Sequence, residues 1–245
     1  MDPTFIGLGF VVGFLVGLTG VGGGALMTPS LIFLGVEPLT AVGTDLLYAT
    51  VTRVFGVFFH GKKGRIRYDI ALRLFAGSVP AIILGGVLLR WINKEVLNKY
   101  LTLLLGVILI MSAVLSLLKG EIHIPIRPRW AYVYLLGFVV GLTVQFTSVG
   151  AGVIVSFTLM NVARLEPKEV VGVTITYGLA LSTFSFLNYA SVGSVDYGIA
   201  SLLILGTVPG VYLGTHVSRN ADGAKLKKAI NIIILLIGLF TLMSR

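Results

Sequence analysis

The sequence lacks cysteine and has little charge. Without a thiol, the chain can form no disulfide, no thiolate metal site and no cysteine nucleophile. Only 12% of its 245 residues are charged, half of the ~25% usual in soluble domains, whereas 56% are hydrophobic. This composition predicts a chain that lies in a lipid bilayer.

Catalytic and metal-binding patterns are also missing. There is no His-Glu-x-x-His, no Gly-x-x-x-x-Gly-Lys-Ser/Thr and no Ser–His pair inside an apolar run. His60, His123 and His216 fall in or beside polar stretches and do not have the spacing of metal ligands. We therefore expect no enzyme activity, no cofactor and no bound metal.

The net charge is +9, which in a soluble protein would suggest nucleic-acid binding. Here the basic residues fall in short segments between apolar runs, where they are better explained as determinants of membrane orientation. The expected surroundings are a lipid bilayer, with no nucleic-acid partner.

Apolar runs dominate the chain, and six of them match the ~20 residues of a spanning helix. The first and fifth runs are longer, and each contains a glycine-rich interruption: Leu-Thr-Gly-Val-Gly-Gly-Gly at 18–24 and Phe-Thr-Ser-Val-Gly-Ala-Gly at 146–152. Glycine weakens a helix interior, so each long run is expected to be two half-length helices joined by unwound backbone. A single long tilted helix is the alternative. The runs lie at 5–35, 38–59, 69–91, 96–118, 130–162, 170–190, 196–217 and 227–243.

The chain repeats itself at an offset of 128–129 residues. Leu-Gly-Phe-Val-Val-Gly occurs at 8–13 and again at 136–141, and Tyr48 aligns with Tyr177. Val-Pro at 79–80 aligns with Val-Pro at 208–209 in the same register. We interpret 1–120 as a first repeat, 121–129 as a linker and 130–245 as a second repeat.

Loop charges indicate how the two copies are oriented. If the first and fifth runs are hairpins, the connections 60–68, 119–129, 162–169 and 217–228 share one side and hold 13 of the 19 basic residues. Only this arrangement obeys the positive-inside rule, and it makes these connections cytoplasmic. Each copy then crosses the membrane an odd number of times, so the second copy is inverted.

The predicted fold is therefore an all-α integral membrane protein with two inverted repeats. Each repeat is expected to contain one re-entrant hairpin and three transmembrane helices. This plan, with interrupted helices near mid-membrane, recurs in secondary transporters. The two hairpin tips should approach the centre from opposite sides and frame one site.

The tips carry groups suited to a small anion. Half-helix N-termini present unpaired N–H groups and partial positive charge, and glycine permits close approach. The alternative is that these small residues only allow close helix packing. The candidate substrate-binding residues are Thr19, Gly20, Gly22, Gly23, Gly24, Thr28, Gln145, Thr147, Ser148, Gly150, Gly152 and Ser156.

Asp45 is the clearest acid deep in an apolar run, and intramembrane ionisable groups are usually functional. It is a candidate carrier of a coupling proton, although a surface carboxylate that caps backbone is an alternative. Its counterpart in the repeat is Thr174, so the site would be asymmetric. Arg53 is a possible anion contact or a snorkelling residue. Pro80 and Pro209 are expected to kink their helices and could act as hinges.

The glycine-rich stretch at 18–24, Ala-Val-Gly-Thr-Asp-Leu at 41–46 and Gly-Ser-Val-Pro-Ala at 77–81 resemble the TauE/SafE sulfite exporter family, also called the toluene-sulfonate uptake permease family. The resemblance covers nearly the whole chain. It implies a bacterial or archaeal plasma-membrane transporter of sulfite, sulfonates or sulfoacetate, driven by the proton gradient. Its Gly-Thr-Asp motif falls on Gly43, Thr44 and Asp45, which adds Thr44 and Thr174 as possible anion contacts.

The leading hypothesis is a secondary active transporter of a small sulfur-containing anion. A passive anion channel and a membrane-embedded enzyme are the alternatives. The second copy departs from the family pattern at Gly150-Ala-Gly152 and Gly172-Val-Thr174, so symmetric use of two acids is not expected.

Overall fold

The computed structural model describes residues 2–19, 23–60, 67–117, 130–161, 163, 165–218 and 223–243, and this part of the chain is helical with short connections. Apolar residues dominate every element, and helices suit a bilayer because a helix satisfies its own backbone groups. The helices are α1 (Thr4–Thr19), α2 (Gly24–Phe33), α3 (Pro38–His60), α4 (Tyr68–Trp91), α5 (Lys94–Leu117), α6 (Trp130–Thr147), α7 (Ala151–Asn161), α8 (Pro167–Ser191), α9 (Tyr197–Ser218) and α10 (Gly223–Met243).

Six helices occupy the six apolar runs of ordinary length: α3, α4, α5, α8, α9 and α10. Local signals fix several of their ends. Pro38 begins α3, after Gly35 has turned the chain with a φ of 86°. At the start of α8, Glu166 and Glu169 form a capping box around Pro167.

The two long runs are each divided into two helices. The first run gives α1 with 16 residues and α2 with 10, and the fifth gives α6 with 18 and α7 with 11. The expected division of each long run into two helices at its glycine-rich stretch is confirmed. The first arm of each hairpin is the longer one, because the break comes after the middle of the run.

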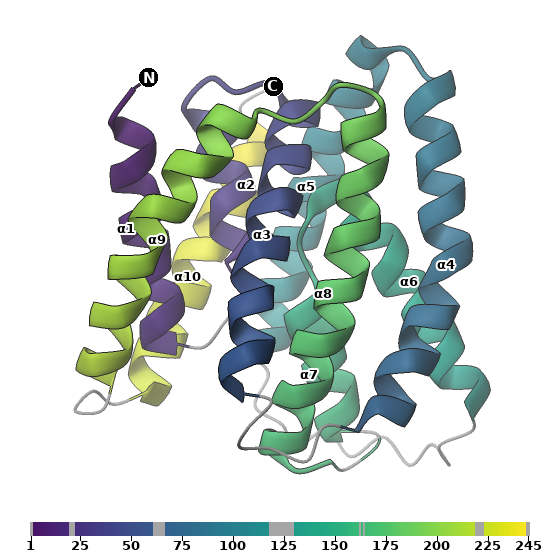
Figure 1. Ribbon diagram of the computed structural model, residues 1–245, viewed down its shortest axis with the longest axis vertical. Helices are drawn as coiled ribbons and strands as arrows, with labels where there is room; N and C mark the ends of the chain where they lie inside the picture. The colour runs from purple at the N-terminus through teal and green to yellow at the C-terminus, as the bar shows by residue number, and fades with distance from the viewer. Residues whose placement is uncertain are drawn as a thin grey trace.

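The hairpins open at opposite ends of the bundle. In Figure 1, α1 begins and α2 ends at the upper end, whereas α6 begins and α7 ends at the lower end. A single long tilted helix does not describe either run. The helix ends that flank 61–66, 118–129 and 219–222 lie at the lower end, and the connections 34–37, 92–93 and 192–196 lie at the upper end.

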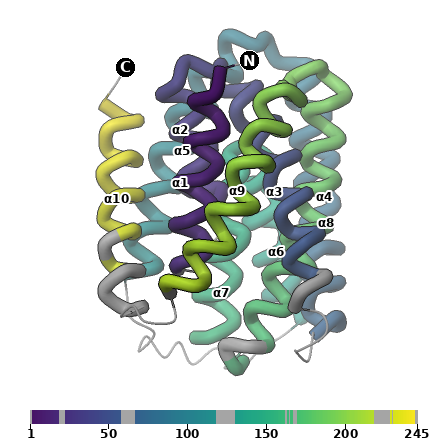
Figure 2. Tube along the Cα trace, turned by 60° about the vertical axis from the view of Figure 1, so that its left-hand side comes forward, coloured from purple at the N-terminus to yellow at the C-terminus, as the bar shows by residue number. Residues whose placement is uncertain are grey.

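The closest helix pairs join the two halves of the chain. Extensive contacts link α1 with α9, α4 with α6, α3 with α8 and α5 with α10 (Figures 1 and 2). When the two repeats are aligned, α1 corresponds to α6 and α4 corresponds to α9. The α1–α9 pair is therefore equivalent to the α6–α4 pair, and in each pair the hairpin helix comes from one repeat and its partner from the other. Neither hairpin packs mainly within its own half.

Glycines at four-residue intervals allow α1 and α9 to approach closely. A Cβ added at Gly13 would lie 2.8 Å from the Thr207 carbonyl oxygen, and one at Gly17 would lie 2.6 Å from that of Val211. Such small-residue interfaces let membrane helices gain dispersion contacts between their backbones. The glycines that face the partner backbone are Gly9, Gly13 and Gly17 of α1 and Gly206, Gly210 and Gly214 of α9.

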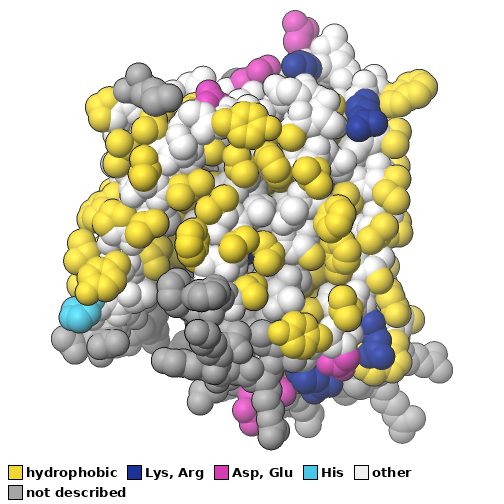
Figure 3. Space-filling model, viewed as in Figure 1, with side chains coloured by type: hydrophobic (Ala, Val, Ile, Leu, Met, Phe, Trp, Pro, Cys, Tyr) yellow, Lys and Arg dark blue, Asp and Glu magenta, His cyan; other side chains and the backbone are white. Residues whose placement is uncertain are grey.

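The outer surface is suited to lipid. Five helices in the described part of the chain are long and apolar enough to cross a membrane: Tyr68–Trp91, Lys94–Leu117, Trp130–Thr147, Glu169–Ser191 and Tyr197–Val217. Figure 3 shows hydrophobic side chains over most of one face, with the acidic and basic side chains gathered at its upper and lower ends. The all-helical membrane class predicted from composition is confirmed.

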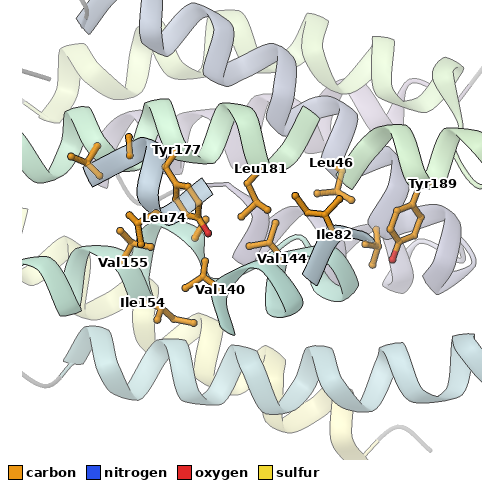
Figure 4. Close-up of a cluster of buried hydrophobic side chains, with 14 of the residues drawn as sticks. Leu46, Leu74, Ile82, Val140, Val144, Ile154, Val155, Tyr177, Leu181 and Tyr189 are labelled. Carbon is orange, nitrogen blue, oxygen red and sulfur yellow. The ribbon is translucent and has the colours of Figure 1, made fainter. Parts of the chain in front are cut away.

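The interior contains a hydrophobic cluster built from both halves. Leu46 of α3 and Ile82 of α4 lie beside Tyr189 of α8, and Val144 of α6 lies beside Leu181 (Figure 4). These side chains are almost fully buried.

Substitution of Gly13 tests the close helix interface. We expect Gly13→Ala to destabilise the purified protein by ~1–3 kcal/mol, because the methyl group meets the α9 backbone. Gly7→Ala is the matched control on the same helix, since a Cβ there has nothing within 4 Å and alanine favours helix. Thermal unfolding in detergent measures both, and equal midpoints for the two variants would contradict the interface.

Candidate functional site

The two helix breaks meet in the interior of the bundle. A Cβ added at Gly24, the first residue of α2, would lie 2.5 Å from the carbonyl oxygen of Ser148 in the second break. The Thr28 hydroxyl also lies 3.4 Å from the Thr147 carbonyl oxygen. Segments more than a hundred residues apart in the chain therefore form one junction.

The second break has an unusual backbone. Ser148 has a φ of 59° and Gly150 a φ of 109°, and positive φ is uncommon for a residue with a side chain. The Thr147 hydroxyl holds the turn, because it donates to the Thr143 carbonyl at 2.6 Å and accepts from the Val149 N–H at 3.2 Å. Residues held in such conformations are concentrated at functional sites.

Asp45 lies at this junction and is fully buried, with 0% of its surface exposed. Thr28 donates a hydrogen bond of 2.5 Å to its Oδ2. A Cβ at Gly24 would be 3.5 Å from the same Oδ2, so the carboxylate lies against the first turn of α2. That turn carries unpaired N–H groups and the positive end of the helix dipole, which stabilise a negative charge.

Several buried polar atoms around the junction have no hydrogen-bond partner in the described part of the chain. They are Oδ1 of Asp45, Oγ of Ser148 and both amide atoms of Gln145. Gln145 has 0% of its surface exposed, and only the absence of a side chain at Gly85 leaves room for it. An unsatisfied buried polar group costs ~1–3 kcal/mol, and such a cluster is expected to bind a ligand or water.

The three residues of the Gly-Thr-Asp motif lie at two different places, the connection before α9 and the junction. Gly43 allows the carbonyl of Ser194 to approach α3, and the Thr44 hydroxyl accepts a 3.0 Å hydrogen bond from the Asp196 N–H. Only Asp45 reaches the junction. The motif therefore also attaches the connection before α9 to α3, and the hydroxyl of Thr44 is directed to that connection.

Two matched hydroxyl networks flank the junction. Thr207 of α9 donates to the Gly9 carbonyl at 3.0 Å, and its hydroxyl lies 3.0 Å from the Tyr48 hydroxyl. Ser78 of α4 donates to the Gly137 carbonyl and lies 2.7 Å from the Tyr177 hydroxyl.

These residues correspond pairwise in the repeat register, with the halves exchanged. The sequence analysis gave these four side chains no functional role. The alignment of Tyr48 with Tyr177 in the internal repeat is the sequence signal that could have identified them.

The remaining candidates lie at varying distances from the junction. Gly23 caps α2, and Gly150 immediately precedes α7. Nothing lies within 4 Å of a Cβ added at Gly152, and Ser156 is half-buried on α7. Thr174 donates within its own helix, to Val170 at 2.9 Å. Gly20, Gly22 and the Thr19 side chain lie outside the described residues.

Arg53 and the two prolines lie away from the junction. Arg53 donates from NH1 to the Gly178 carbonyl of α8 at 3.3 Å. Pro80 and Pro209 are inside α4 and α9 and are exposed on the outer surface of the bundle. Their role as hinges stays a prediction.

An all-helical bundle with an apolar exterior and a polar junction of two interrupted helices defines a multi-pass membrane protein. The profile of the family described as "Sulfite exporter TauE/SafE" matches residues 5–241. The chain therefore belongs to the TauE/SafE family, as the resemblance predicted.

Named relatives agree with this assignment. The "Probable membrane transporter protein YjnA" of Bacillus subtilis is 35% identical, over 98% of this chain and 99% of its own length. YdhB of the same organism is 26% identical over 95% of this chain and 97% of its own, and MJ0441 of Methanocaldococcus jannaschii is 24% identical over 98% and 95%. Both carry the same transporter description. No solved structure matches the chain. The protein is a membrane transporter and not an enzyme.

Removal of the Thr28 hydroxyl tests the environment of Asp45. We expect Thr28→Val to lower stability by ~1–3 kcal/mol, because the buried carboxylate loses its donor. The loss should be greater in alkaline than in acidic buffer, since a charged carboxylate depends more on that donor than a protonated one. Ser30→Ala is the control, because its hydroxyl donates only within α2, to Leu26 at 2.7 Å. The same melting midpoints for both variants at both pH values would refute this environment.

Proposed function

We propose that this protein is a secondary active transporter of a small sulfur-containing oxyanion, of the sulfite, sulfonate or sulfoacetate class, coupled to protons. The observation that carries the proposal is the cluster of unpaired buried polar atoms where the two helix breaks meet. The substrate class comes from the family to which the chain belongs.

The junction has the donors that an oxyanion needs. The N–H groups of the first turns of α2 and α7 have no partner within their own helices. The Ser148 hydroxyl and the Gln145 amide add side-chain donors beside them. An anion with several oxygens could accept hydrogen bonds from both hairpins at once, so its binding would depend on how the two halves are placed.

Asp45 supplies the coupling in this proposal. Its carboxylate already lies against the N-terminal turn of α2, where the substrate anion would bind. Two negative charges in one buried site repel strongly at low local dielectric. Protonation of Asp45 removes that repulsion, so anion and proton would bind together and cross together.

Alternating access would follow from two inverted repeats. The exchanged helix pairs and the matched hydroxyl networks support this reading. So does an asymmetry between equivalent positions: Gly24 is packed against Ser148, whereas its counterpart Gly152 has open space beside it. Inverted repeats in different packing states are the expected basis of a carrier that opens to one side at a time.

The proposed location is the plasma membrane of a prokaryotic cell, with the basic connections in the cytoplasm. The 13 basic residues of the four connections at 60–68, 119–129, 162–169 and 217–228 support this orientation.

Single cysteines test the orientation, because the chain has none of its own. Tyr68 and Tyr197 are equivalent in the repeat register and have similar exposure, 57% and 59%. We expect a membrane-impermeant maleimide to label Tyr197→Cys from outside intact cells and Tyr68→Cys only after permeabilisation. Labelling of both from the same side would refute the inverted arrangement.

Flux into proteoliposomes tests the function. We expect labelled sulfite or sulfoacetate uptake to respond to an imposed pH gradient, and Asp45→Asn to abolish that response while anion-dependent thermal stabilisation persists. Glu37→Gln is the control acid, since Glu37 is exposed and accepts from Asn98 at the upper end.

Three results would contradict the proposal. The first is no flux of any such anion through folded protein, and the second is large unitary currents, which indicate a channel. The third is a wild-type pH response in Asp45→Asn, which would remove Asp45 from the coupling.

A further inference from the structure

Arg53 is a cation inside the bundle that has no acidic partner among the described residues. It lies on α3, eight positions after Asp45, or ~12 Å further toward the lower end at 1.5 Å per residue. The side chain is half-buried, and within the described residues it donates one hydrogen bond, to the Gly178 carbonyl of α8. A guanidinium has five N–H donors, so most of them have no partner among the described residues.

Gly178 makes this placement possible. A Cβ added there would lie 2.9 Å from Nε of Arg53 and 3.3 Å from its Cζ. The guanidinium therefore lies against the α8 backbone where a side chain is missing, in the interface between α3 and α8. Since these helices come from different halves of the chain, Arg53 is located between the two moving parts of the proposed carrier.

Arg53 forms no close ion pair with an acid in the described part of the chain, although Asp45, further along α3, attracts it electrostatically. The hydroxyls of Thr50 and Ser182, nearby in the same interface, bond to each other at 3.1 Å. The hydroxyl of Tyr177, next to Gly178 on α8, is paired with Ser78. Asp45 accepts its hydrogen bond from Thr28 at the junction.

Arg73 shows how this fold accommodates an arginine with a structural role. Its Cζ lies 3.4 Å from the centre of the Trp130 ring, so a cation–π contact offsets part of its burial cost, although its buried Nη1 has no hydrogen-bond partner in the described part of the chain. Arg53 has no such aromatic contact in the described part of the chain. A charge at membrane depth costs several kcal/mol, and such residues usually serve a pathway.

We propose that Arg53 forms a second anion subsite, on the route between the lower end of the bundle and the junction. It would bind the transported oxyanion through two parallel N–H···O bonds before or after the anion occupies the junction. A guanidinium fork matches two oxygens of one sulfur centre, which favours oxyanions over halides. This inference rests on the proposed function for its substrate, although anion binding at Arg53 can be tested without transport.

Thermal stabilisation by sodium sulfate in detergent tests the subsite directly, with sodium chloride at equal ionic strength as the reference. We expect sulfate to stabilise wild type more than Arg53→Gln, and Arg53→Lys to give an intermediate shift because it keeps the charge but loses the fork. Gly178→Ala should also reduce the shift, since the methyl group displaces the guanidinium without changing charge. Arg73→Gln is the control for the general salting effect of sulfate and should respond as wild type does.

The same variants are then compared in proteoliposomes. We expect Arg53→Gln to lower kcat/KM for sulfoacetate about tenfold, and by less for methanesulfonate, which has one charge fewer. If wild type transports neither anion but the sulfate shift depends on Arg53, the subsite stands and the proposed function fails.

Two outcomes would overturn the subsite. One is an equal sulfate shift in wild type, Arg53→Gln and Gly178→Ala. The other is a loss of flux in Arg53→Gln that is the same for both anions and is accompanied by a lower melting midpoint without sulfate. A purely structural contact between Arg53 and Gly178 would give that result.

Discussion

The arrangement of the helices in this protein depends on how interrupted helices can exist inside a bilayer. Lipid offers no hydrogen bonds, so non-helical backbone at that depth must face protein or a water-filled cavity. In this chain the second break lies against the start of α2. The Ser148 carbonyl lies against the start of α2, and the Thr28 hydroxyl reaches both Asp45 and the second break. The hairpins therefore have to meet, and the other helices enclose their meeting point.

The features that follow the internal repeat differ in kind from those that depart from it. The networks of Tyr48 with Thr207 and Tyr177 with Ser78 preserve the repeat, because both tie a hairpin to a span from the other half. Asp45 has only Thr174 as its counterpart, and Thr174 bonds within its own helix. Features that hold the bundle together are duplicated, whereas Asp45, the proposed carrier of the coupling proton, occurs once.

Much of the fold could be predicted from the sequence because the relevant signals are local. Long apolar runs delimit the helices, and glycines at 22–24 and 150–152 with polar neighbours mark the breaks. The partner of each helix could not be predicted. Glycine at every fourth position of α1 indicates a close interface but does not identify α9 as the other side.

Side-chain direction separates two neighbouring residues of one motif. Adjacent residues on a helix differ by ~100°, so Thr44 is directed to the connection before α9 while Asp45 reaches the junction. The sequence motif alone does not show this difference. The unpaired Gln145 amide could be named from its neighbourhood, but its burial depends on Gly85 of a distant helix.

The pairing of α1 with α9 also affects how the chain is assembled during synthesis. The glycine face of α1 is made first, yet Gly9 and the Thr207 hydroxyl that it binds are 198 residues apart. Until α9 is inserted, the first hairpin lacks its main partner and its backbone face remains turned to lipid or to a chaperone. The contact that secures the glycine face of α1 therefore forms only after the residues between Gly9 and Thr207 have been made.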